Sequence, residues 1–163
     1  MFRRVVIANR GEIAIRVART CWKLGVQPVG VYSEADTRSL HRRFMAEDVC
    51  IGPAPPAESY LDIEKVVRAA EEMGCEAVHP GYGFLAENPG LPRRCEEEGF
   101  AFVGPPAPAM ALSGDKIASR RAMAAAGIPV TQGMDRVLRG VDESREVADA
   151  LGYPVLFKAT AGG

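Results

Sequence analysis

The sequence lacks a long apolar run, a basic excess and a large net charge, and each absence excludes a class of protein. No apolar stretch approaches the ~18 residues that a membrane-spanning helix needs. The short apolar run 5–8 that follows the basic N-terminus is too short for a secretory signal. A formal net charge of −1 gives no electrostatic basis for binding nucleic acid. We therefore expect a cytoplasmic protein that contacts neither membranes nor nucleic acid.

Side chains that bind metals are also scarce. The sequence contains four cysteines, with no Cys-x-x-Cys pair, and only two histidines. Because a structural zinc site draws about four such ligands from short spacings, no metal site is predicted in this chain. The cysteines are expected to be small buried or half-buried thiols, as is usual in a reducing compartment.

What the sequence does contain is a repeated pattern, in which a helical stretch ends in glycine and an apolar run follows at once. Glycine closes helices because it readily adopts the left-handed conformation, and short apolar runs are typical of buried strands. The glycines are Gly25, Gly74, Gly99, Gly127 and Gly152, and the predicted strands are 26–31, 75–78, 100–103, 128–130 and 153–157.

Helices are predicted between these strands. The stretches 11–24 and 60–73 have apolar residues at helical spacing, with Ile13, Val17, Cys21 and Leu24 on one stripe of the first. Ser59 and Asp62, at the start of the second stretch, have the spacing of a capping box. Strands that alternate with helices of this length predict an α/β fold with a parallel sheet. Ligands of such sheets bind at the loops that follow the carboxyl ends of the strands. Two such loops here are 9–12 and 79–88.

The first loop reads "ANRGEI" and contains a single glycine, Gly11. A dinucleotide-binding turn requires the pattern G-x-G-x-x-G. A structural turn into a helix is therefore favoured over a dinucleotide site, with Glu12 well placed near the positive end of the helix.

The second loop reads "HPGYGFLAEN", and two interpretations of it stay open. In the first, Gly81 and Gly83 expose backbone amides and Tyr82 presents its ring and hydroxyl to a ligand. In the second, the loop is a rigid turn that packs Phe84 and Leu85 into the core.

Two lysines are candidates for contact with an anion. Lys116 begins a predicted helix, and composition alone favours a solvated lysine there. Lys158 ends the apolar run "YPVLFKA", directly after the predicted strand 153–157, and precedes a glycine-rich turn. A lysine on an otherwise buried strand needs an anionic partner, and successive backbone amides of a turn bind phosphate oxygens. A phosphate site is therefore favoured at Lys158, although not a Walker A loop, because the lysine precedes the glycines.

Taken together, these stretches resemble the biotin carboxylases of the ATP-grasp superfamily. The matching segments follow the family order along the whole chain, and "HPGYGFLAEN" is a highly specific motif. The segments are "IANRGEIAIRVART", "VGVYSEAD", "CIGPAPPAESYLDIEKVVRAA", "HPGYGFLAEN", "GFAFVGP", "GDKIASR", "AGIPV" and "GYPVLFKATAGG".

The resemblance implies a fold in two parts. Residues 1–112 resemble the Rossmann-like N-terminal domain of the family, which precedes the ATP-grasp domain. Residues 113–163 resemble the start of that ATP-grasp domain, which is incomplete because the chain ends at Gly163.

The resemblance also implies site residues, although no catalytic residue and no metal ligand of the family falls in this segment. Two kinds of contact are implied, one with ATP and one beside the biotin. The ATP-contacting residues are Lys116, Lys158, Gly162 and Gly163, and the loop residues that face the biotin site are Tyr82 and Gly83.

The implied activity is that of an ATP-dependent ligase. Biotin carboxylase uses MgATP and bicarbonate to carboxylate biotin on a biotin carboxyl carrier protein, in partnership with a carboxyltransferase and, in some relatives, for fatty acid biosynthesis. The Mg²⁺ ligands of the family lie beyond this chain. The 163-residue chain is therefore expected to be inactive alone, and the alternative is a fragment that only folds, dimerises or binds a partner.

Two departures from the family pattern bear on these expectations. Lys23 stands where many relatives carry an acidic residue, on a helix that contributes to the family's usual dimer contact. A homodimer and a monomer therefore both stay open. Thr160 replaces a smaller residue or serine before the glycines, which is a mild change. A dinucleotide-binding oxidoreductase is a weaker rival, because the second and third glycines of its motif are missing.

Overall fold

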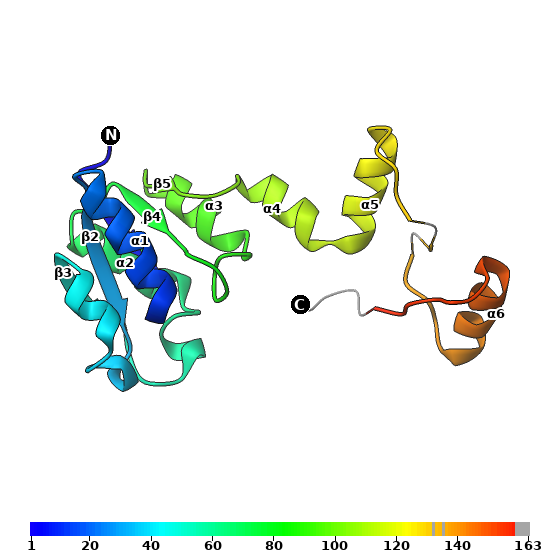
Figure 1. Ribbon diagram of the computed structural model, residues 1–163, viewed down its shortest axis with the longest axis horizontal. Helices are drawn as coiled ribbons and strands as arrows, with labels where there is room; N and C mark the ends of the chain where they lie inside the picture. The colour runs from blue at the N-terminus through cyan, green and yellow to red at the C-terminus, as the bar shows by residue number, and fades with distance from the viewer. Residues whose placement is uncertain (132, 135, 159–163) are drawn as a thin grey trace. The chain divides into compact units, whose positions relative to one another are not determined.

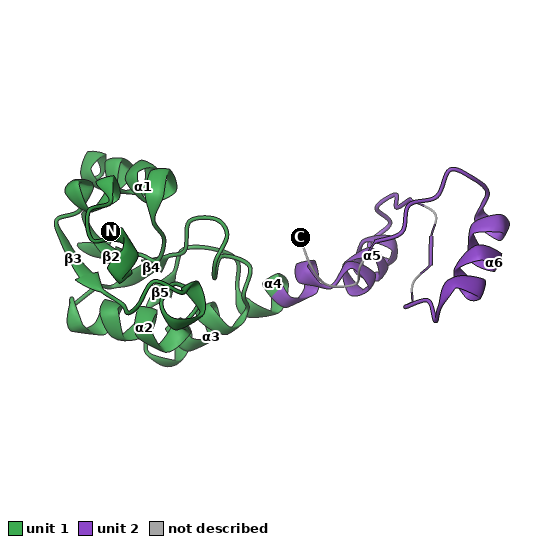
Figure 2. Ribbon diagram, turned by 90° about the horizontal axis from the view of Figure 1, so that it is seen from below, with its two compact units in different colours: residues 1–110 green, residues 111–163 purple. Residues whose placement is uncertain are grey.

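The computed structural model describes residues 1–131, 133–134 and 136–158 (Figure 1). The chain divides into two compact units, which we call unit 1 (Met1–Met110) and unit 2 (Ala111–Gly163) (Figure 2). Within the described ranges, no helix is both long enough and apolar enough to cross a membrane.

Unit 1 is built on a five-stranded parallel sheet with the order β3-β2-β1-β4-β5. The strands are β1 (Arg4–Ile7), β2 (Gln27–Tyr32), β3 (Glu47–Cys50), β4 (Ala77–His79) and β5 (Ala101–Phe102). Ile7 of β1 pairs with Gly30 on one side and with His79 on the other. The chain winds outward from β1 to β3 and then crosses to β4, so the winding direction reverses between β1 and β4. The predicted α/β fold with a Rossmann-like parallel sheet is confirmed.

Helices cover both faces of this sheet. Figure 2 shows α1 on one face and α2 and α3 on the other, and two separate hydrophobic clusters lie beneath them. The α-helices of unit 1 are α1 (Gly11–Lys23), α2 (Ile63–Glu72) and α3 (Gly90–Glu97), and the short 3-10 helices are η1 (Glu34–Asp36), η2 (Leu40–Phe44) and η3 (Pro56–Glu58).

The amphipathic patterns of α1 and α2 bury small and β-branched residues against the sheet. Val17 and Cys21 of α1 are buried as predicted, and Val66 and Val67 of α2 pack in the cluster on the other face. Leu24, which the pattern placed on the same stripe, instead caps the end of α1 and is 56% exposed. The stripe therefore ends one turn earlier than the sequence predicts.

The start of α2 differs from the predicted capping box. Asp62 itself is the N-cap, because its side chain accepts a hydrogen bond from Lys65 N at 3.1 Å. The Ser59 hydroxyl instead donates to Pro55 O at 2.9 Å. Asp62 therefore stabilises the first turn of the helix, and Ser59 stabilises the turn before it.

Three of the five predicted strands are present and two are not. Residues 26–31, 75–78 and 100–103 correspond to β2, β4 and β5. The predictions for 128–130 and 153–157 are wrong, since neither stretch is a strand. A strand requires a hydrogen-bonding neighbour, and every strand of the described residues belongs to the sheet of unit 1.

Unit 2 is helical in its described residues. Helix α4 (Ala107–Gly114) leads from unit 1 into unit 2, and α5 (Lys116–Ala125) and α6 (Val141–Leu151) follow. Ala148 is the only buried residue that the structure describes in this unit. Large apolar side chains stay in solvent, with Leu156 79% and Phe157 57% exposed.

The four cysteines are free thiols. Cys21, Cys75 and Cys95 are buried, as predicted, and burial raises the pKa of both Cys75 and Cys95 to about 11. Cys50 is exposed at the end of edge strand β3, so the expectation of a buried thiol is wrong there.

Candidate functional site

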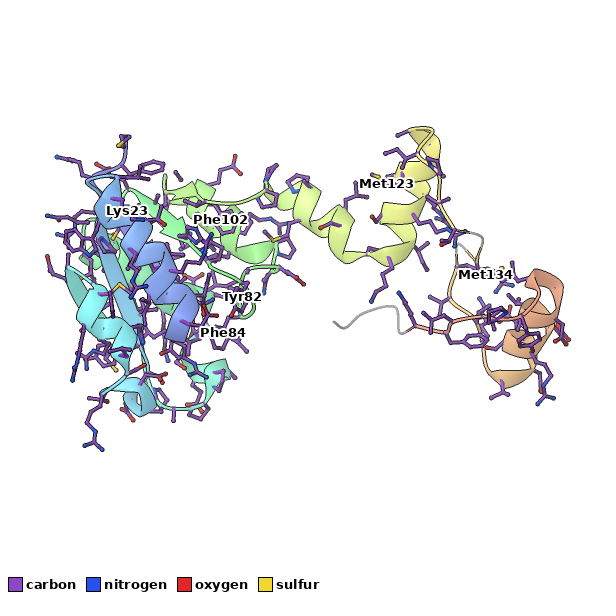
Figure 3. All side chains as sticks on the ribbon, viewed as in Figure 1. Lys23, Tyr82, Phe84, Phe102, Met123 and Met134 are labelled. Atoms are coloured by element: carbon purple, nitrogen blue, oxygen red, sulfur yellow. The ribbon has the colours of Figure 1, made fainter. Side chains whose placement is uncertain are left out.

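The candidate site of unit 1 lies where the winding direction of the sheet reverses. Open α/β sheets bind ligands in the crevice at this point, outside the carboxyl ends of the strands. Two loops meet there: residues 8–10, which follow β1, and residues 80–84, which follow β4. Their junction continues the sheet, because Ala8 N donates to His79 O at 2.9 Å. Figure 3 shows Tyr82 and Phe84 near the end of α1 that is remote from Lys23.

Tyr82 and Gly83 form the outward side of the second loop. Tyr82 is 61% exposed, and its hydroxyl donates to the Glu12 carboxylate in the first turn of α1. This hydrogen bond is the main reason that the pKa of Tyr82 is raised. Gly83 has a φ of +66°, and nothing lies within 4 Å of the position that a Cβ would take. Both residues are therefore accessible to a ligand, and glycine also suits the backbone conformation.

The inward side of the same loop belongs to the core. Leu85 is 1% exposed, and Phe84 packs against the cluster beneath α2 and α3. The two interpretations of "HPGYGFLAEN" therefore describe two sides of one loop. Phe84 has a φ of +45°, in a region that non-glycine residues rarely adopt.

Asn9 connects the two loops. Its side chain is buried, and Nδ2 donates to Pro80 O at 2.8 Å and to Tyr82 O at 2.7 Å. Its Oδ1 accepts from Arg10 N at 2.9 Å. All three hydrogen bonds run to backbone atoms, so the loop position depends on the amide group of Asn9.

His79 supports the loop from the end of β4. Its Nδ1 accepts a hydrogen bond from Gly81 N at 3.0 Å, which requires the unprotonated nitrogen. Desolvation lowers the pKa of His79 from its ordinary value, and the positive charge of Arg16 lowers it further. The neutral form is therefore the one that the fold favours.

An aromatic and charged cluster borders the same loop. The rings of Tyr60 and Phe84 stack with centroids 4.9 Å apart, and Arg10 Cζ lies 5.9 Å from each centroid. The Tyr60 hydroxyl donates to Asp36 Oδ2 at 2.8 Å and accepts from Ser33 N at 3.0 Å. Burial and the hydrogen bond to Asp36 both raise the pKa of Tyr60, which therefore stays protonated. The cluster is a rigid support rather than an acid–base pair.

The predicted ATP-contacting residues fall in unit 2. Lys116 is exposed at the first position of α5, where the Asp115 side chain caps the helix by accepting from Ile117 N and Ala118 N. Lys158 is also exposed, but it follows an irregular stretch and not the buried strand from which its anionic partner was argued. The burial argument for Lys158 is therefore wrong. Gly162 and Gly163 lie outside the described residues.

The described residues offer no obvious metal site. Across 1–131, 133–134 and 136–158, no three His, Cys, Asp or Glu side chains cluster closely enough to hold an ion. Glu143 at the start of α6 instead pairs with Arg136 and accepts from Arg139 N, and these contacts lower its pKa.

Sequence reasoning singled out the two loops but missed the residues that hold them. Asn9 lies at the end of the buried run that begins with β1. A buried polar side chain needs hydrogen-bond partners, so an asparagine at this position was the one feature of the sequence that could have indicated its role. Tyr60 lies in a turn and Asp36 ends the short 3-10 helix η1, and the local pattern of neither stretch indicates that they meet.

Each part of the chain is similar to a known protein family. Residues 1–110 match the family described as biotin carboxylase, N-terminal domain. Residues 115–163 match the family described as carbamoyl-phosphate synthase L chain, ATP binding domain.

Individual relatives match the chain over its whole length. The biotin carboxylase of Halalkalibacterium halodurans is 48% identical over 163 residues, which are 36% of its own length. Biotin carboxylase 1 of Bacillus subtilis is 46% identical over 163 residues, which are also 36% of its length. The chain thus spans about a third of the length of these curated relatives.

Solved structures agree with these matches. The biotin carboxylase domain dimer of Hydrogenobacter thermophilus 2-oxoglutarate carboxylase, crystallised with MgADP, ADP and bicarbonate, superposes with a TM-score of 0.94 at 47% identity. A biotin carboxylase–β,γ-ATP complex from Campylobacter jejuni gives a TM-score of 0.94 at 42% identity. Both matches cover 100% of this chain and 36% of the solved chain.

Proposed function

The chain belongs to the biotin carboxylase family, and on this premise we propose that it is the N-terminal part of an enzyme that carboxylates biotin. The reaction would consume MgATP and bicarbonate, release ADP and phosphate, and leave the carboxyl group on biotin held by a carrier protein. On its own, the 163-residue chain would not turn over ATP.

One observation carries the proposal for unit 1. The turn at Tyr82 and Gly83 is open to solvent at the reversal point of the sheet, while its neighbours on both sides are fixed to the core. Such a turn suits contact with a small, largely uncharged group such as the bicyclic ring of biotin. We assign Tyr82 and Gly83 to the wall beside biotin.

Unit 2 would contribute to ATP binding. We assign Lys116 and Lys158 to the phosphates, where exposed ammonium groups can neutralise negative charge. Gly162 and Gly163 would begin the flap that covers them. Bound Mg²⁺ would supply further charge neutralisation, but the described residues do not suit it, and its ligands are assigned to the rest of the enzyme. We place the domain boundary between residues 112 and 113.

The proposal extends to partners and location. The carrier protein and a carboxyltransferase are the expected partners, and the solved biotin carboxylase domain of Hydrogenobacter thermophilus 2-oxoglutarate carboxylase is a dimer. We propose a homodimer on that ground. A cytoplasmic location is supported by buried thiols, which are usual in reducing compartments.

The test joins residues 1–163 to the part of Bacillus subtilis biotin carboxylase 1 that lies beyond its matched segment. This fusion is expected to release ADP in the presence of bicarbonate and free biotin, whereas the 163-residue chain alone should not. Lys158→Ala in the fusion should lower kcat/KM by on the order of 10²-fold, because a charge-stabilising contact with phosphate is lost. Lys65→Ala, which removes the same group from α2, where it contacts Glu58 O and Asp62 and lies outside the assigned site, should change it little.

Two results would contradict the proposal. A folded fusion without biotin-dependent ADP release, under conditions in which the Bacillus subtilis enzyme is active, would remove the assigned activity. Turnover by the short chain would show that its catalytic groups lie within residues 1–163.

A further inference from the structure

The turn at Tyr82 and Gly83 presents a physical problem. It belongs to neither a helix nor a strand, and both residues are exposed, so they make little packing of their own. A wall that contacts a small ring must nevertheless stay within a fraction of an ångström of its productive position. Something beneath the turn must therefore hold it.

The buried amide of Asn9 is the group that reaches it. Asn9 is 3% exposed, and its Nδ2 donates to the carbonyls of Pro80 and Tyr82, on either side of Gly81. Its Oδ1 accepts from Arg10 N in the same strand-to-helix turn. Two carbonyl partners on one side and an N–H partner on the other allow only one orientation of the amide.

Gly81 completes this attachment by having no side chain. A Cβ at Gly81 would lie 2.8 Å from Asn9 Nδ2, 3.2 Å from Asn9 Cβ and 3.1 Å from Ile13 Cγ1. The backbone at Gly81 also has a φ of +68°, which favours glycine. The loop therefore lies directly on Asn9, with no space for even a methyl group between them.

A second attachment lies directly after the turn, at Phe84. Phe84 takes an unfavourable positive φ, and its ring stacks on Tyr60 with an interplanar angle of 16°. The Tyr60 hydroxyl is in turn fixed by Ser33 and Asp36. Residues outside their preferred backbone regions persist where the surroundings over-determine them, often at functional sites.

We propose that Asn9 is a positioning residue that fixes the turn at Tyr82 and Gly83 for contact with biotin. Asn9 itself touches no substrate. The proposal rests on the proposed function in its assignment of the turn to biotin, but the attachment of the loop to Asn9 can be tested without any activity.

Asn88 provides a matched control for substitutions of Asn9, because these two residues are the only asparagines in the sequence. Asn88 is exposed and uses only its Oδ1, which accepts from Gly90 N at 2.8 Å. An aspartate can still accept that bond. At position 9, by contrast, the same change removes both donors and directs a carboxylate at two carbonyl oxygens.

The first measurement is amide hydrogen exchange in the 163-residue chain. The loop amides of Gly81 and Ala86 both donate hydrogen bonds, to His79 Nδ1 and Gly83 O. Asn9→Asp should speed their exchange about tenfold or more, while the amides of β2 stay protected. Asn88→Asp should leave all of them unchanged. Equal exchange in wild type and Asn9→Asp would overturn the attachment, and so would equal acceleration in the two variants.

The second measurement is steady-state kinetics in the fusion enzyme. Asn9→Asp should raise KM for free biotin about tenfold and change KM for ATP less than about twofold, whereas Asn88→Asp should change neither. A rise in both KM values, or in neither, would overturn the link to biotin. If the unsubstituted fusion shows no biotin-dependent activity, the proposed function fails and the link to biotin fails with it. The exchange experiment still decides whether Asn9 holds the loop.

A second variant covers the case in which Asn9→Asp does not fold. Gly81→Ala leaves the Asn9 amide intact but pushes the loop away from it by the contacts given above. Folding is checked by the fluorescence of Trp22, the only tryptophan, whose indole N–H donates to Phe44 O at 2.8 Å. Gly81→Ala should accelerate exchange at Ala86 as Asn9→Asp does, and unchanged exchange would overturn the proposal.

Discussion

Units 1 and 2 share one sequence pattern, a glycine followed by an apolar run, but this pattern adopts different structures in the two units. Glycine followed by an apolar run forms a strand at Gly25, Gly74 and Gly99, and forms none after Gly127 or Gly152. Unit 1 buries its runs in a five-stranded sheet that helices cover on both faces.

Unit 2 shows the same kind of residues without the burial. Val130, Leu156 and Phe157 are 40%, 79% and 57% exposed. The difference shows that an apolar run does not form a strand by itself, since the backbone hydrogen bonds of a sheet must come from a neighbouring strand. Unit 1 contains the neighbouring strands that its apolar runs pair with, whereas the described residues of unit 2 form no strand.

The largest expected contrast between the units is in hydrogen exchange. Amides of residues 5–8 and 29–32 lie in the central strands, so their exchange requires opening of the whole sheet. Amides of 141–151 lie in a helix that buries only Ala148. We expect exchange in α6 to be faster by on the order of 10³, measured by mass spectrometry or NMR. Equal protection in the two regions would break the comparison.

Side-chain truncation should give the next largest effect. Ile7 is fully buried, so Ile7→Ala should lower the free energy of unfolding by about 2–5 kcal/mol. Leu156→Ala, in an exposed side chain of unit 2, should change it by less than about 0.5 kcal/mol. Urea titration followed by Trp22 fluorescence reports on unit 1, and circular dichroism reports on both units. If Leu156→Ala lowered the free energy of unfolding as much as Ile7→Ala does, unit 2 would have a core of its own.

The smallest expected effect is a dependence of stability on pH. Both histidines, His41 and His79, lie in unit 1, so a histidine-dependent change in stability should appear in unit 1 and not in unit 2. The pKa of His79 is lowered in the folded protein, chiefly by desolvation. Below its ordinary pKa of 6.5 the unfolded chain therefore binds a proton that the folded chain does not. The stability of unit 1 should be complete above that pH and should fall as the pH drops through 6.5 toward the lowered pKa.

The measurement compares wild type with His79→Asn in urea titrations between pH 7.5 and 5.5. Asparagine keeps an acceptor near the position of Nδ1 but does not titrate, so the variant should lose less stability as the pH falls. Any contribution of His41 is common to both proteins and cancels in the difference. Identical slopes would show that His79 does not carry the effect.

Local sequence determined much of unit 1. Glycines at helix ends, amphipathic spacing in α1 and α2 and β-branched runs are consequences of backbone geometry and burial, which act over a few residues. They led to the parallel α/β fold and to the two loops that meet at the reversal of the sheet. The motif "HPGYGFLAEN" led to the family.

Only the tertiary structure decided which residues hold the candidate site together. Asn9 meets Pro80 and Tyr82 across more than 70 positions of sequence, and Tyr60 meets Phe84 from a separate loop. No local pattern encodes such a pairing, because the contacts of Asn9 depend on β1 and β4 becoming neighbours. The same physics explains the failed strand at 153–157: an apolar run fixes the tendency to be buried, and only a partner in space determines whether it is.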